Sequence, residues 1–107
     1  MAINNSEVID FIGVNEMNNE VILTISDHFN WEGVDEHLKA LQDKLNSYIN
    51  FVESGEIFQT YADAINRNII IEVVGNYKLP TSAVNFYKHT SKILAELNIK
   101  LRFKNLS

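Results

Sequence analysis

The stretch Leu23–Trp31 reads LTISDHFNW, and we expect the fold to be built around it. Its first half continues a pattern typical of a β-strand, in which Val21, Leu23 and Ile25 share one face. The polar residues that follow lead into the strongest helical pattern of the sequence, and the chain's only tryptophan lies at this point. The stretch is therefore predicted to be the corner where a core strand meets a core helix.

The predicted helix after this corner carries one continuous apolar stripe, because its large apolar residues recur every three or four positions. Either Asn30 or Asp27 is expected to cap its start, and Gly55 to end it. At ~1.5–3 kcal/mol per fully buried large side chain, the stripe is expected to be one of the largest contributions to the core. Its members are Val34, Leu38, Leu41, Leu45, Tyr48, Ile49 and Val52.

The rest of the chain predicts three more strands and one more helix. The first two strands read as a hairpin joined by a polar five-residue loop, and Thr81 or Ser82 is expected to cap the second helix after Pro80. Residues 56–67 fit a short helical turn and an irregular loop equally well. The expected strands cover residues 8–14, 20–26, 68–74 and 99–103, and the second helix covers residues 81–97.

The order β-β-α-β-α-β predicts an α+β fold with two layers: a four-stranded mixed sheet with two helices on one face. A chain of 107 residues suits one core, so residues 1–107 are expected to form a single domain. The link from strand to helix to strand at the C-terminal end should place the last two strands parallel.

Two helices cover only one face of such a sheet, which leaves an apolar set on the other face. An exposed apolar face usually marks an association surface, so the sequence predicts a homodimer formed through that face or an adjoining helix. In the alternative interpretation, residues 56–67 or the termini cover the face and the protein is a monomer. The apolar set is Val8, Ile12, Val14, Ile22, Ile70 and Val74.

Composition and charge exclude several classes of protein. The chain has no cysteine, no signal-peptide pattern in its first residues and no apolar run near the roughly 20 residues needed to span a bilayer, so we expect a cytosolic protein. Residues 1–66 carry twelve acidic and two basic side chains, while residues 67–107 carry seven basic and two acidic ones. The net charge of −5 disfavours non-specific nucleic-acid binding, and folding is expected to mix the two charged halves.

Four segments carry a resemblance to a known family. Val8–Gly13 reads VIDFIG, Leu23–His28 followed by Trp31 reads LTISDHxxW, His37–Asn46 reads HLKALQDKLN, and Glu53–Glu56 reads ESGE. Together they resemble a family of small bacterial proteins classed as a domain of unknown function. The resemblance implies a bacterial or phage source and a stand-alone domain, and it implies no activity or site.

The strongest polar cluster lies at the predicted corner. His28 and His37 beside Asp27 have the chemistry of an acid–base pair or of metal ligands, but the sequence offers neither a His-x-x-x-His helix pair nor an obvious third ligand. Phosphate-cradling glycine loops and nucleophile elbows are absent as well. No catalytic residue, metal or cofactor is therefore predicted, and the preferred interpretation is that Asp27 braces the turn while Trp31 packs the helix onto the sheet.

The preferred functional hypothesis is a non-enzymatic domain that binds another protein in an adaptor, inhibitor or immunity-type role, with an acidic surface facing a basic partner. The alternative is a small-molecule binder or enzyme with a pocket between residues 27–31 and 56–67. A third hypothesis is that the protein contacts nucleic acid through Lys100, Arg102 and Lys104. The candidate ligand- or partner-binding residues are Asp27, His28, Trp31, Glu36, His37 and Tyr61.

Overall fold

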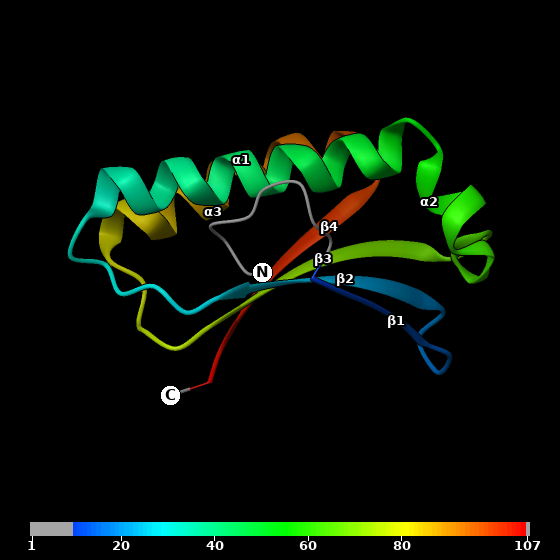
Figure 1. The fold of residues 1–107 in the computed structure, drawn as a ribbon, viewed down its shortest axis with the longest axis horizontal. Helices are drawn as coiled ribbons and strands as arrows, with labels where there is room; N and C mark the ends of the chain where they lie inside the picture. The colour runs from blue at the N-terminus through cyan, green and yellow to red at the C-terminus, as the bar shows by residue number, and fades with distance from the viewer. Residues whose placement is uncertain (1–9, 107) are drawn as a thin grey trace.

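A computed structural model of the chain describes residues 10–106. These residues form two layers, an open four-stranded sheet and helices that lie against one of its faces (Figure 1). The predicted α+β architecture is therefore confirmed. The elements are β1 (Phe11–Asn15), β2 (Glu20–Asp27), α1 (Val34–Glu53), α2 (Glu56–Thr60), η2 (Ala62–Ala64), β3 (Asn68–Gly75), α3 (Thr81–Glu96) and β4 (Ile99–Asn105).

The strands lie side by side in chain order, β1-β2-β3-β4. β1 is antiparallel to β2, while β3 is parallel to both β2 and β4. The predicted parallel pairing of the last two strands is confirmed. Because parallel neighbours need a crossover connection, α1 carries the chain from one end of the sheet to the other before β3 begins, and α3 does the same before β4 (Figure 1).

The predicted helix caps are wrong, whereas the predicted helix stop is confirmed. Gly33 and Pro80 are the N-caps of α1 and α3, and neither helix has a side-chain cap. The Asn30 and Asp27 side chains accept the amides of residues 32 and 29 instead, so they stabilise the loop before the helix. At the other end, α1 stops just before Gly55, which has the left-handed φ of 82° that glycine adopts readily.

The segment 56–67, which the sequence left open, contains both helical and irregular structure. The five-residue helix α2 is followed by the single 3-10 turn η2. Its buried residues, Ile57 and Ala64, close the core at the amino ends of β2 and β3. The positive φ of Asn66 then redirects the chain into β3.

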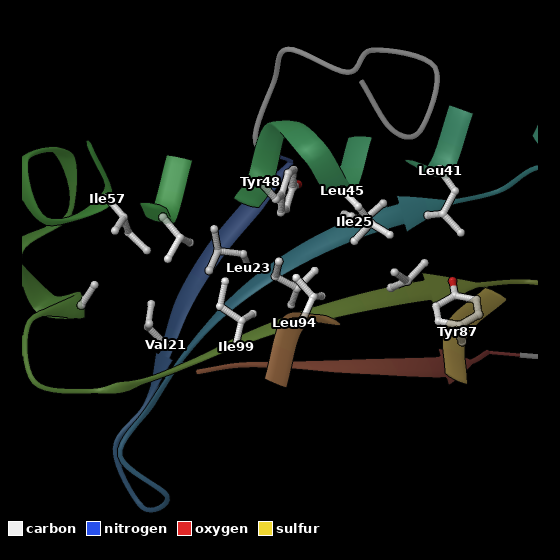
Figure 2. Close-up of a cluster of buried hydrophobic side chains, with 14 residues drawn as sticks. Val21, Leu23, Ile25, Leu41, Leu45, Tyr48, Ile57, Tyr87, Leu94 and Ile99 are labelled. Carbon is white, nitrogen blue, oxygen red and sulfur yellow. The ribbon is translucent and has the colours of Figure 1, made fainter. Parts of the chain in front are cut away.

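The core fills the space between the helices and the covered face of the sheet (Figure 2). Tyr48 of α1 lies in it with no exposed surface. Its hydroxyl donates to the carbonyl of Thr24 at 2.6 Å and accepts the amide of Asp10 at 2.8 Å. Burial raises the pKa of Tyr48, so the hydroxyl keeps its proton and can make both bonds. One tyrosine thus fastens the helix to β2 and to the residue that precedes β1.

The uncovered face of the sheet is less apolar than predicted. Ile12 and Val14 pair with Leu23 and Val21, and residues directly opposite each other on neighbouring strands share a face. Both therefore lie on the covered face, because the hairpin register, which the sequence alone does not give, sets the phase of the first strand. Val8 lies outside the described residues. The remaining three, Ile22, Ile70 and Val74, do lie on the uncovered face.

We call this uncovered face the open face. It carries Phe11 of β1, Ile22 of β2, Ile70 of β3 and Lys100 of β4, together with the residues two positions away in each strand. Ile70 is only 2% exposed, whereas Phe11 is 65% exposed. Within residues 10–106 no helix lies over the open face (Figure 1). The same part of the chain contains no helix that combines the length and apolarity needed to cross a membrane.

Two tyrosines provide a matched test of the core. Tyr48→Phe removes two hydrogen bonds, and we expect it to lower the free energy of unfolding by about 1–3 kcal/mol. Tyr87→Phe removes a buried hydroxyl that has no hydrogen-bond partner in the described part of the chain, so it should be neutral or stabilising. Urea unfolding of both variants checks the pair. Equal losses would show that the Tyr48 bonds contribute little.

Candidate functional site

The predicted corner contains a buried acid–base pair. Asp27 is the last residue of β2 and His37 lies in the first turns of α1, and each is 3% exposed. The His37 Nε2 atom lies 2.6 Å from Asp27 Oδ2 and 2.7 Å from Oδ1. The strand and the helix on either side of the loop are therefore joined directly by their side chains.

Both nitrogens of the His37 ring are engaged. Nδ1 lies 2.9 Å from the carbonyl oxygen of Asn30, and a carbonyl only accepts, so Nδ1 carries a hydrogen. Nε2 contacts the Asp27 carboxyl group. Neither ring nitrogen is therefore open to a metal ion or a substrate.

Aromatic rings enclose the pair. The Trp31 ring stacks on the His37 ring with centroids 3.5 Å apart and an interplanar angle of 13°, and Phe29 meets the same ring edge-on at 5.8 Å. The Phe29 amide also donates to Asp27 Oδ1 at 3.2 Å. In this apolar setting the two groups depend on each other, because removal of one leaves the other buried without its partner.

A cleft of about 400 Å³ opens beside this pair, and His28, Glu36, His37 and Tyr77 are among the residues that line it. It lies at the carboxyl ends of β2 and β3, between the loops that follow these two parallel strands. His28 and Glu36 are exposed, and His28 contacts the Phe29 ring edge-on at 4.8 Å without joining the buried pair. The structure thus brings five predicted site residues, Asp27, His28, Trp31, Glu36 and His37, to one corner.

The sixth, Tyr61, lies elsewhere. It follows α2, at the opposite end of the sheet from the corner (Figure 1). At about 1.5 Å per residue, the 20-residue helix α1 carries the chain roughly 30 Å away from Asp27 before residue 56 is reached. The predicted pocket between residues 27–31 and 56–67 is therefore wrong, and Tyr77 of the β3–α3 connection provides the far wall instead.

Sequence reasoning missed a second buried pair. Lys44 of α1 has no exposed surface, and its Nζ atom lies 3.0 Å from Asp10 Oδ1. The other Asp10 oxygen accepts the amide of Ser26 at 3.0 Å. The sequence does contain an indication of such pairs. His37, Lys44 and Tyr48 lie on the buried stripe of α1, and the stripe of an amphipathic helix normally carries apolar side chains.

One of the three basic residues of β4 is paired with carboxylates of the same chain. The Arg102 guanidinium lies 3.7 Å from the Glu20 carboxylate and 3.3 Å from that of Glu72. These ion pairs reduce the positive charge that the open face offers to phosphate groups. Metal ligands do not converge either: within residues 10–106, no three His, Cys, Asp or Glu side chains are grouped closely enough to hold an ion.

A family model described as a family of unknown function matches residues 1–107. The chain belongs to this family, DUF6572. The family resemblance seen in the sequence is confirmed. The curated proteins and the solved structures gave no match.

The buried pair gives a direct test of its structural role. Asp27→Ala leaves the buried His37 ring without its carboxylate, and we expect the free energy of unfolding to fall by about 3–5 kcal/mol. Asp43→Ala is the control, because Asp43 pairs with Lys39 at 3.5 Å on the solvent-exposed side of α1. Its loss should stay below about 1 kcal/mol. Urea unfolding that gave equal losses would contradict the role assigned to Asp27.

Proposed function

We propose that this DUF6572 domain is a non-enzymatic protein-binding module that associates with a second copy of itself through the open face. The observation that carries the proposal is the open face itself, on which Phe11 is 65% exposed and the half-buried Ile22 and Val74 lie beside charged side chains. An apolar strip with a charged rim is the usual composition of a protein interface. The proposed setting is the cytosol of a bacterium, which the absence of cysteine supports.

The corner supports the non-enzymatic part of the proposal. Its buried histidine has both nitrogens in hydrogen bonds, so the pair lacks the free acceptor that a general base needs. The pair is also covered by Trp31 and Phe29. These contacts suit a group that fixes the start of α1 onto β2.

The proposal predicts a mass of twice 12.3 kDa in light scattering at micromolar concentrations. Ile22→Lys places a charge in the centre of the open face and should return the monomer mass. Ile93→Lys is the matched control, because Ile93 is 48% exposed on α3, in the helix layer, and should leave the dimer intact. A monomer mass for the unchanged protein would overturn self-association.

A second candidate function is small-molecule binding in the cleft at the corner. The specific observation is its position, since open α/β sheets bind ligands beyond the carboxyl ends of their parallel strands. The polar groups available there include the His28 ring, the Glu36 carboxylate and the Tyr77 hydroxyl.

A panel of metabolites tested by thermal shift addresses this candidate. A ligand that raises the melting temperature of the unchanged protein should lose its effect on the double variant His28→Ala with Tyr77→Ala. Both side chains are exposed, so the variant should fold normally. Retention of the shift by the double variant would place the ligand outside the cleft.

A further inference from the structure

We infer that an extended, acidic segment of a partner protein joins the sheet as an additional strand beside β4. The segment alternates apolar and acidic residues. Its apolar side chains enter a groove between β4 and α3, and its acidic side chains lie beside lysines of β4. This interaction goes beyond the proposed self-association and does not depend on it, because each copy has its own β4 edge.

The backbone of β4 provides the first part of the site. β4 is the last strand of the sheet and pairs with β3 along one side only. Along residues 99–104, alternate backbone amides and carbonyls therefore point away from the sheet. An extended peptide can hydrogen-bond to such an edge and lie beside it as a new strand. In this mode of recognition the main-chain bonds give affinity, and pockets for alternate side chains give specificity.

A groove between β4 and α3 provides those pockets. It consists of two neighbouring clefts of about 440 and 600 Å³, and Ser91 of α3 and Leu101 of β4 line both of them. The small side chains of Ser91 and Ala95 leave this space on the helix side. The apolar surface in the groove is accessible to solvent, because Val84 is 37% exposed and both Leu101 and Phe103 are only half-buried.

The alternation of β4 defines the sequence of the segment. Leu101 and Phe103 lie on the side of the groove, since they pair with the core residues Ile71 and Val73 of β3. The residues between and beside them point to the open face. Residues directly opposite each other on neighbouring strands share a face. A strand beside β4 therefore places every second side chain in the groove and the others beside the basic residues of β4.

Charge selects an acidic segment. Lys88 and Lys92 of α3 line the smaller cleft. Lys100 and Lys104 lie on β4, and all four lysines are exposed. Within residues 10–106 none of the four forms an ion pair, whereas Glu20, which lines the larger cleft, already takes part in one. The lysines attract carboxylates and oppose the pairing of β4 with β4 of a second copy, because like charges would then face each other.

A peptide suits this surface better than a nucleic acid. Both would be attracted to the lysines, but a nucleic acid has no peptide backbone to pair with the edge of β4. Most contacts to a nucleic acid are polar and involve its phosphates and sugars, so the apolar side chains of Leu101 and Phe103 would be of little use to it.

A synthetic peptide tests the strand pairing with the unchanged protein. The labelled probe has seven residues, the length of β4, and alternates glutamate with valine. Its binding is followed by fluorescence anisotropy. Two further peptides carry N-methyl groups, one on every glutamate amide and the other on every valine amide. Successive amides of a strand point to opposite edges, so only one of these two sets faces β4.

We expect one methylated peptide to lose affinity about tenfold or more, because several hydrogen bonds are lost, and the other to bind like the probe. Equal binding of the two methylated peptides, whether retained or lost, would overturn strand addition. Displacement of the probe by an oligodeoxythymidylate of equal charge, at a lower concentration than unlabelled probe requires, would overturn the assignment to a peptide.

Charge reversal gives an independent test of the groove. Lys100→Glu places a carboxylate beside the glutamates of the probe and should weaken its binding about fivefold or more. Lys39→Glu is the matched control, because Lys39 is exposed on α1 and lines neither cleft. Equal weakening by the two variants would show that overall charge alone attracts the probe. A monomer mass in light scattering would remove self-association and leave this inference in place, so the two proposals fail separately.

Discussion

The attachment of α1 to the sheet by two buried acid–base pairs is the constraint on which the rest of the fold depends. Asp27 holds His37 at the start of the helix, and Asp10 holds Lys44 two turns further along. An apolar stripe alone tolerates small rotations and slips of a helix, whereas each pair has one acceptable partner position. A rotation of α1 would leave ionisable groups buried without partners, which costs more than a displaced methyl group.

This fixed helix organises both ends of the molecule. At the carboxyl ends of β2 and β3 it brings the loop with Trp31 over His37 and leaves the cleft beside it. At the other end it delivers the chain to α2, whose Ile57 closes the core. The strand order also keeps the acidic and basic halves of the sequence on neighbouring pairs of strands, and among the described residues the ion pair that joins them is Arg102 with Glu20. The expected mixing of charge is thus seen on the open face.

Periodicity was sufficient to predict the strands, both long helices and the corner, because these follow from side chains that repeat within one element. Periodicity was insufficient where the position of a residue depends on how two elements pack against each other. Lys44 reads as a polar interruption of the stripe until Asp10 is known to lie opposite. Which face of the sheet Ile12 lies on depends on the register of the hairpin, which periodicity within one strand does not give. The position of Tyr61 follows from one further rule: parallel β2 and β3 require α1 to cross the sheet, and this crossing separates residues 27–31 from residues 56–67.

The location of the cleft at the carboxyl ends of the strands has a consequence for a face-to-face pair. Association through the open face would leave the helices as the two outer layers, and each copy would keep its own cleft. Such a particle would be bivalent, with two equal recesses. A polymeric or repetitive target would then be held with greater avidity than a single soluble molecule, without any change in the contacts at either recess.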